Sequence, residues 1–223
     1  MPGVATVVSV QVGCVRELDA DAPGDDRDPW RSAIIKQPVE GPVRVVLFGL
    51  AGDEQADRVH HGGVDKAVLG YAADHYAAWK SDLPEAPFPY GGFGENLTIA
   101  SVTEADVCIG DVYELGSCRL QVSQPRQPCW KLSRRWRLPE LTALVLKTGR
   151  TGWYFRIVVP GEIESGTPLR LVERPFPEFT IARANEVMYG RPRDAARDRA
   201  LAACAALSGA WREALLARAA AGD

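Results

Sequence analysis

The sequence has few cysteines and no long apolar run, and each shortage excludes a class of protein. The 223 residues include five cysteines, an odd number, with no CxxC pair or Cys/His spacing typical of a metal site. No apolar run approaches the length that crosses a bilayer, and residues 1–15 lack the regions of a signal peptide. We therefore expect a cytoplasmic protein without disulfides, rather than a membrane protein or a disulfide-stabilised one.

The sequence also lacks an excess of positive charge. Its formal net charge is -3, so nothing draws the whole chain to a nucleic-acid polymer or an anionic lipid surface. Basic residues gather instead over Arg126–Arg137 and again between residues 147 and 156. A local anion site would explain the first cluster, and a solvated helix face would explain Arg134, Arg135 and Arg137 equally well.

Short β-branched runs separated by glycine and proline turns fill the chain as far as residue 174. This pattern is typical of a β-barrel, and too few helices interrupt it for a parallel βαβ series. The acidic run over residues 19–29 has too little apolar content to order itself and is expected to form a surface loop. Strands are expected over residues 5–15, 43–50, 67–71, 112–115, 118–122, 154–159 and 169–172, and helices over residues 73–81, 130–136 and 139–148.

The composition changes after Arg174, where the sequence Arg-Pro-Phe-Pro ends the last expected strand and alanine and arginine become frequent. Thr180 or the residue before it can cap a helix that runs through Tyr189. Pro192 is well placed near the start of a second helix, and residues 208–209 separate that helix from a third. We therefore expect a β-barrel domain over residues 1–174 and a three-helix module over residues 175–223.

One cysteine is placed to be presented to a ligand rather than packed. Cys129 follows a strand-like run within Val122–Leu132 (VSQPRQPCWKL), where two prolines favour a rigid loop that continues neither sheet nor helix. Arg126 and Lys131 favour the thiolate, which attacks electrophiles and ligates soft metals. Packing as a small apolar side chain is the alternative for Cys129, and it is the preferred interpretation of the other four cysteines.

A glycine-rich segment, HHGGVDKAV over residues 60–68, precedes this loop. Gly62 and Gly63 would let a ligand approach the backbone, and exposed amides there can bind anionic oxygen. His61 adds a titratable donor, and Asp65 and Lys66 add a pair of opposite charges. Taken singly, these features are equally well explained by a turn, a core histidine and a weak surface ion pair.

A second glycine-rich segment, GGFGENLT over residues 91–98, carries a carboxylate followed by the carboxamide of Asn96. Together these two groups could form hydrogen bonds with the edge of a heterocycle that has both donors and acceptors. An ordinary turn leading into a strand explains the same residues.

In this order, HHGGVDKAV, FGENLT and VSQPRQPCWKL, followed by TGRTGWYFRIVVPG, closely resemble the MOSC domain and, within it, the bacterial YiiM-type proteins. The likeness begins at residues 32–39 (SAIIKQPV) and extends to residue 172, and the remainder resembles the three-helix module of the same group more loosely. The resemblance implies a mainly β protein, a MOSC-type barrel with peripheral helices. It also implies binding of the molybdenum cofactor, in which the dithiolene of a phosphorylated pterin holds the metal. Pyridoxal phosphate binding is a further expectation that accompanies it.

The resemblance also suggests roles for individual residues. The family's motif cysteine falls on Cys129, so its thiolate is the expected protein ligand of molybdenum. Arg126 and Lys131 are then expected partners of the anionic cofactor, because guanidinium and ammonium groups bind phosphate. Further candidates for the cofactor cradle are Ser32, Lys36, His61, Gly62, Gly63, Asp65, Lys66 and Asn96.

Family members act as reductases of N-hydroxylated compounds, so the resemblance implies an oxidoreductase acting on N-hydroxylated bases, hydroxylamines or amidoximes. In that role Cys129 fixes the metal and His61 or a nearby acid assists protonation of the leaving oxygen, while Tyr90, Phe93 or Trp153 lines a pocket for a planar substrate. The sequence has no dinucleotide, haem or iron–sulfur motif. Electrons are therefore expected from a separate flavoprotein reductase, with the helical module as its docking surface.

Two alternatives stay open. MOSC domains also resemble the C-terminal domain of molybdenum cofactor sulfurases, which would make the chain a carrier of cofactor or of a Cys129 persulfide. No pyridoxal-phosphate domain is fused to the chain, and this favours the reductase. A thiol enzyme with Cys129 as nucleophile and His61 as base would need no metal. No heptad or other interface motif fixes the oligomeric state.

Overall fold

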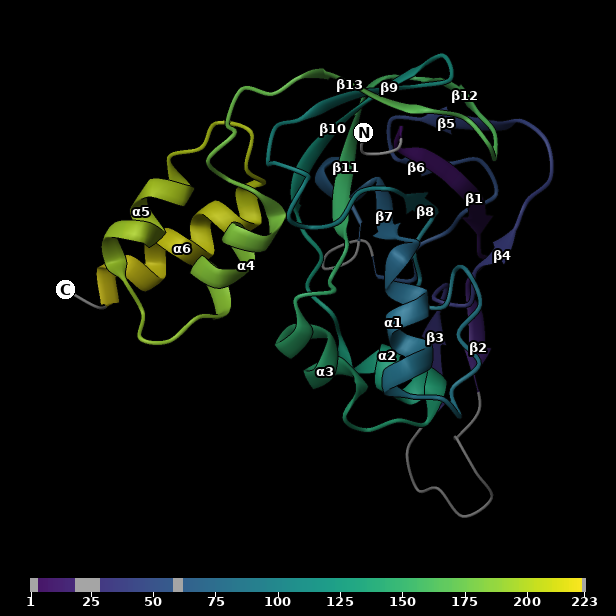
Figure 1. The fold of residues 1–223 in the computed structure, drawn as a ribbon, viewed down its shortest axis with the longest axis horizontal. Coiled ribbons are helices and arrows are strands. Elements are labelled where there is room, and N and C mark those ends of the chain that lie inside the picture. Colours follow the sequence, from purple (N-terminus) through teal and green to yellow (C-terminus); the bar gives the residue numbers. More distant parts are fainter. Residues whose placement is uncertain (1–3, 19–28, 58–61, 222–223) are drawn as a thin grey trace.

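The computed structural model describes residues 4–18, 29–57 and 62–221, and its central element is a curled β-sheet (Figure 1). Eight strands follow the order β13-β9-β10-β11-β7-β8-β1-β4. The two ends of the sheet approach each other, because Thr6 bridges Pro168 and the Leu169 amide donates to the Ala5 carbonyl at 2.8 Å. The expected barrel is confirmed. Its strands are β1 (Thr6–Val12), β4 (Gln37–Pro38), β7 (Val68–Ala72), β8 (Leu97–Ala100), β9 (Val112–Leu115), β10 (Cys118–Pro125), β11 (Trp153–Val159) and β13 (Leu169–Glu173).

Two small sheets accompany the barrel. The first consists of β12 (Gly161–Ile163), β5 (Val43–Val46) and β6 (Gly49–Leu50). The single strand expected over residues 43–50 is therefore a hairpin, and Gly49, with φ of 141°, permits its reversal. The second pairs β2 (Arg16–Leu18) with β3 (Trp30–Ser32). Most of the expected acidic loop, residues 19–28, lies outside the described residues.

Three helices cover one end of the barrel: α1 (Asp74–Asp82), α2 (Trp130–Trp136) and α3 (Leu141–Thr148). Helix α1 connects β7 to β8, which pair in parallel. The glycine at position 149 ends α3 with a φ of 72°, the left-handed conformation typical of a helix C-terminus. The three helices and the segment around Phe93 share a second apolar core, whose buried members are Tyr71, Trp79, Phe93, Leu132, Leu141 and Val145.

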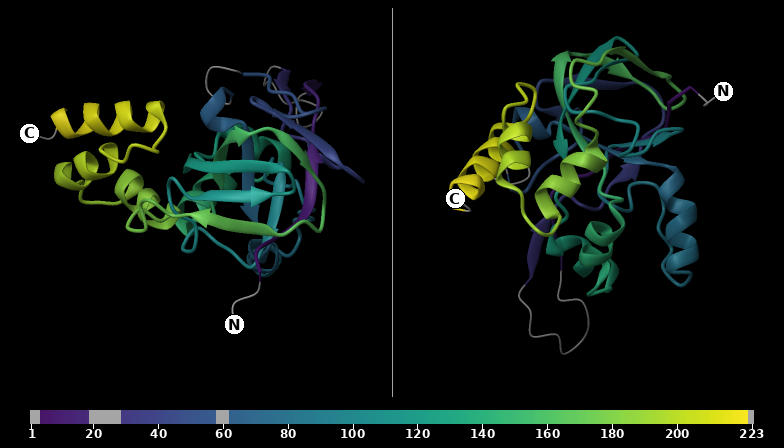
Figure 2. Two further views of the ribbon diagram at one scale, coloured as in Figure 1. Left: turned by 90° about the horizontal axis from the view of Figure 1, so that it is seen from above. Right: turned by 60° about the vertical axis from the view of Figure 1, so that its left-hand side comes forward.

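The C-terminal helices α4 (Ile181–Tyr189), α5 (Ala195–Ala202) and α6 (Gly209–Ala221) lie together beside the barrel (Figure 2). Thr180 caps α4 as expected, accepting from the Arg183 amide at 3.1 Å. The cap of α5 is Asp194, two residues after the proline expected near its start. Ile181 and Ala184 of α4 belong to the same buried cluster as the core of the barrel, so the three-helix module packs continuously against the barrel.

Three of the four cysteines expected to pack do so, namely those at positions 108, 118 and 204. Burial raises the pKa of each of these thiols, that of Cys118 to about 11, and a raised pKa keeps a thiol protonated and unreactive. Cys14 is exposed, so the packing expectation is wrong for it. It follows the end of β1, beyond the alternation that directs side chains into the barrel.

Candidate functional site

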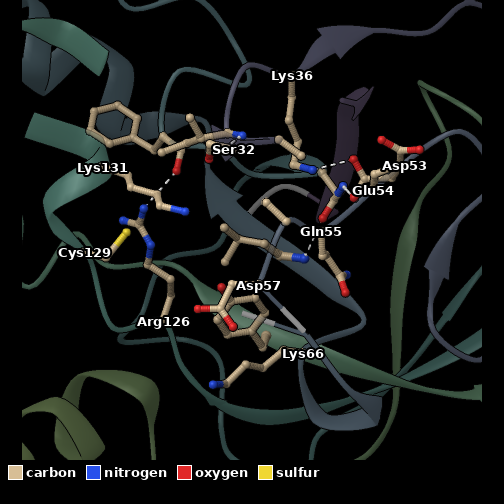
Figure 3. A pocket seen from close by; sticks show the side chains of 18 of the residues that line it. Ser32, Lys36, Asp53, Glu54, Gln55, Asp57, Lys66, Arg126, Cys129 and Lys131 are labelled. Atoms are coloured by element: carbon tan, nitrogen blue, oxygen red, sulfur yellow. Dashed lines mark hydrogen bonds and ion pairs between the residues drawn. The ribbon is translucent and has the colours of Figure 1, made fainter. Parts of the chain in front are cut away.

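A cavity of about 680 Å³, counting its open mouth, lies between the barrel and α2 (Figure 3). The walls come from segments far apart in the sequence: residues 32–36, 53–57, 93–96 and 126–131, together with Lys66, Leu69 and Tyr154. Each segment that carries the family resemblance contributes to this cavity.

Cys129 lies in the cavity wall, half-buried, at the residue that precedes α2. Its carbonyl accepts from the Leu132 amide and from the Thr142 hydroxyl, both at 3.1 Å, so the backbone that carries the thiol is fixed. Contrary to expectation, β10 continues through Pro125, which pairs with Trp153. A proline can occupy the end of a strand because no ladder hydrogen bond requires its nitrogen there. The thiol is therefore presented four residues after a strand.

Arg126 is a buried cation in the wall of the cavity. Its side chain donates through Nη2 to the Phe93 carbonyl at 3.0 Å, and only 5% of the residue is exposed. Its other terminal nitrogen, Nη1, has no hydrogen-bond partner within the described part of the chain. A buried guanidinium nitrogen without a partner is costly, and an anion in the cavity would satisfy it.

Three further candidates, Ser32, Lys36 and Lys131, also line the cavity. Lys131 donates to the Arg31 carbonyl at 2.9 Å, and the Ser32 hydroxyl accepts from the backbone amide two residues later at 3.2 Å. The ammonium of Lys36 forms a buried ion pair with Asp53. Because Asp53 balances its charge, Lys36 offers less to an anionic ligand than the sequence suggested.

Asn96 lies in the wall, but its carboxamide is occupied by the protein. Its oxygen accepts from the Leu69 amide at 3.1 Å, and its nitrogen donates to the Gln11 carbonyl at 3.2 Å and to Asp53 at 2.9 Å. The carboxylate of Glu95 is fully buried and accepts from two backbone amides of its own turn. Glu95 and Asn96 therefore stabilise the wall itself, and the expectation that they form hydrogen bonds with the edge of a heterocycle is not supported.

Of the glycine-rich segment, the structure describes residues 62–68, and only one of these lines the cavity. His61 lies outside the described residues. Gly62, Gly63 and Asp65 are not among the residues that line the cavity. Asp65 instead forms an ion pair with Arg156 at 2.7 Å. The neighbouring Lys66 does line the cavity, and burial lowers the pKa of its ammonium while nearby carboxylates partly oppose that shift.

Sequence reasoning did not single out the acidic side of the cavity. Asp53, Glu54 and Asp57 all line it. Their signal in the sequence was three carboxylates within five residues, directly before the glycine-rich segment. Each is ordinary for a surface loop, so only the fold shows that they face the cationic wall.

Among the aromatic residues expected in the pocket, only Phe93 lines it. Phe93 stacks on Tyr71 with ring centroids 4.6 Å apart, so its ring is fixed. Trp153 is fully buried and belongs to the barrel core, and the adjacent Tyr154 lines the cavity instead. Neighbouring residues of a strand point to opposite faces, so the side chain that faces the cavity is the one directly after Trp153. Tyr90 lies on the surface, 42% exposed.

The solvated-face interpretation of the basic cluster holds for Arg137, which is exposed, and is wrong for its neighbours. Arg134 is buried, its guanidinium carbon 5.6 Å and 5.7 Å from the ring centres of Trp30 and Trp130. Arg135 donates to two backbone carbonyls, at 2.6 Å and 2.8 Å, and burial lowers its pKa. These two arginines join α2 to the other walls of the cavity.

Comparison with known families agrees with this geometry. Residues 57–170 match the model of the MOSC domain, and residues 179–222 match that of the YiiM-like, 3-alpha helix domain. The chain belongs to the MOSC-domain family, in its YiiM-like group. The second match covers α4, α5 and α6, so the C-terminal helices are characteristic of the same group.

Individual relatives match between 72% and 93% of the chain. "Uncharacterized protein YflK" of Bacillus subtilis is 38% identical over 93% of this chain and 91% of its own length. "Protein YiiM" of Escherichia coli is 37% identical over 81% of each chain. A Gibberella moniliformis protein named "Reductase" is 40% identical over 72% of this chain, which spans only 29% of that protein.

A solved structure extends the likeness to three dimensions. The crystal structure of YiiM from Geobacillus stearothermophilus superposes with a TM-score of 0.80 at 37% identity, covering 96% of this chain and 99% of the other. Within the described part of the present MOSC protein, no helix is long and apolar enough to cross a membrane. Nothing in the described residues supports pyridoxal phosphate binding.

Proposed function

We propose that this MOSC protein is a molybdenum cofactor-dependent reductase of N-hydroxylated compounds. The observation that carries the proposal is that Cys129 and the buried Arg126 line the same cavity. Nη1 of this arginine has no hydrogen-bond partner in the described residues. A thiolate suits molybdenum, and the unpartnered nitrogen suits an anion bound beside it. The membership in the MOSC family and the relative named "Reductase" support the same activity.

The residues present fit the cofactor. Cys129 would hold the metal, while Arg126 and Lys131 would receive its anionic groups. When bound, the cofactor supplies two electrons for cleavage of an N–O bond. Phe93 and Tyr154 are the aromatic residues among those that line the cavity, and a planar substrate such as an N-hydroxylated base is the one we propose.

Electrons have to enter from outside, and we propose a separate flavoprotein reductase as their source. In the Gibberella protein the matching segment is part of a much longer chain, whereas the YiiM-type relatives have nearly the length of this one. The helical module is our proposed docking surface and the cytoplasm our proposed location. Deleting the module would not test docking, because Ile181 and Ala184 share the core of the barrel.

The first test is molybdenum and pterin content per protomer, for wild type and Cys129→Ala purified from a host that makes the cofactor. Cys14→Ala, which removes an exposed thiol elsewhere, is the matched control. We expect near-stoichiometric molybdenum in wild type and control, its loss in Cys129→Ala, and reduction of an N-hydroxylated base with reduced viologen. Wild type without molybdenum would refute the proposal, and cyanide-labile sulfur on Cys129 would then identify a sulfur carrier.

A further inference from the structure

The cations of the cavity differ in whether they can release a proton. Arg126 carries a guanidinium, which stays charged at any physiological pH. Lys36 is held in a buried ion pair with Asp53, and Lys131 donates to a backbone carbonyl. Lys66 carries an ammonium that can release a proton, and it lines the same cavity as the carboxylate of Asp57. Figure 3 shows the two side chains on the same side of the cavity, below Arg126.

The backbone that carries Lys66 is fixed. Lys66 ends the short 3₁₀ helix η1 (Val64–Lys66), and its amide donates to the Gly63 carbonyl at 3.1 Å. The Ser123 hydroxyl of β10 donates to the Asp65 carbonyl at 2.5 Å. Since β7 begins two residues later and all of its residues are buried, the position of Lys66 in the wall is determined by the barrel.

The charges around Lys66 also suit proton transfer. Desolvation lowers its pKa, and Asp57 and Asp65 oppose that shift. Asp65 is engaged with Arg156, whereas Asp57 lines the cavity together with Lys66 (Figure 3). Arg126, directly after β10, and the half-buried Tyr154 of β11 also line the cavity. A lysine with a lowered pKa is a better acid near neutral pH than an ordinary lysine.

We propose that Lys66 is the proton donor to the leaving oxygen and that Asp57 positions its ammonium, an inference that rests on the proposed function. In the step R₂N–OH + 2e⁻ + 2H⁺ → R₂NH + H₂O the N–O bond breaks. Lys66 Nζ gives one proton to the oxygen, which leaves as water, and solvent supplies the proton for nitrogen. The electrons come from the flavoprotein or, in the assay, from reduced viologen. Solvent then returns a proton to the neutral side-chain amine of Lys66.

The kinetic test compares Lys66→Arg with Lys80→Arg, an exposed lysine on α1. Arginine keeps the positive charge but cannot give up a proton. We expect Lys66→Arg to lower kcat about 100-fold, to retain molybdenum, and to lose the alkaline limb of the wild-type pH profile. The control should match wild type. A Lys66→Arg enzyme with wild-type kcat, or one that loses molybdenum in proportion to its rate, would overturn the proposal.

A second readout needs no cofactor. The lysines of cofactor-free protein are reductively methylated with ¹³C, and the Lys66 resonance is assigned by its absence in Lys66→Arg. We expect Lys66 to titrate at lower pH than Lys80, and at still lower pH in Asp57→Asn, because that change removes a supporting negative charge. If Lys66 titrates at the same pH as Lys80, the proposal is overturned even if the enzyme proves to be a reductase. Wild type that is fully loaded yet inactive would refute the proposed function instead.

Discussion

Asp53 and Asn96 hold each other in the wall of the cavity. The Asn96 carboxamide donates to Asp53 Oδ2 at 2.9 Å, while Asp53 Oδ1 accepts from the Gly13 amide at 2.8 Å and pairs with Lys36. Three segments distant in sequence thus meet at one carboxylate. The wall opposite Cys129 is therefore a preformed polar network, in which every member depends on the others.

Replacing Asn96 with aspartate should destabilise the protein. The new carboxylate would face Asp53 in place of a donor, and a buried charge without compensation costs about 3–5 kcal/mol. Denaturant unfolding at neutral pH measures the loss. The loss should shrink as the pH falls, because the repulsion raises the pKa of the new carboxyl in the folded state and its protonated form can again donate. Gln37→Glu, at an exposed position of β4, is the control, and an equal loss in both variants would contradict the prediction.

Much of the fold could be predicted because it depends on local patterns. Alternating β-branched residues identified the long strands, the helix over residues 130–136 was placed at its observed bounds, and the end of α4 was placed at Tyr189 as observed. β2 and β3 were missed. They are three residues long and carry charged side chains, such as those of Arg16 and Arg31, so only their pairing across a loop makes them strands.

The site was predicted in outline because its residues lie close together along the chain, but their individual partners are set by distant segments. Arg126 and Cys129 do line one cavity. Asp65 points to Arg156, which lies 91 residues further on, and no local pattern reveals this. Likewise, the groups that donate to Asn96 and Asp53 come from segments distant in the sequence. The prediction for His61 is untested by the structure.

Arg126→Lys should reduce retention of the molybdenum cofactor. The substitution keeps the charge but removes the planar fork that contacts the Phe93 carbonyl and leaves Nη1 for a ligand. Losing such a supporting contact typically weakens metal affinity about 10–100-fold. Molybdenum per protomer after extended dialysis is the measurement, and Arg156→Lys, which alters an arginine that does not line the cavity, is the control. Full retention in Arg126→Lys would count against a role for this residue.

Asp198→Ala should destabilise the whole protein rather than the helical module alone. Asp198 is 2% exposed and pairs with Arg218, which also donates to the Val187 carbonyl at 2.8 Å. Removing one partner of a buried pair costs about 3–5 kcal/mol. Because the module and the barrel share a core, far-ultraviolet circular dichroism and tryptophan fluorescence should report a single coincident transition. Arg197→Ala, at a mostly exposed side chain, should change stability by less than about 0.5 kcal/mol.

Lys66→Met should stabilise the cofactor-free protein in a manner that depends on pH. Burial lowers the pKa of Lys66 in the folded state below its ordinary value of 10.5, so the unfolded chain binds more protons between the two pKa values. The stability of wild type therefore rises with pH across that window, and below the folded-state pKa the full penalty of the buried charge is present. Methionine carries no such penalty. We expect the variant to have the higher melting temperature at neutral pH and its advantage to shrink as the pH approaches 10.5. A constant advantage across that range would mean that packing, rather than the desolvated charge beside Asp57, distinguishes the two proteins.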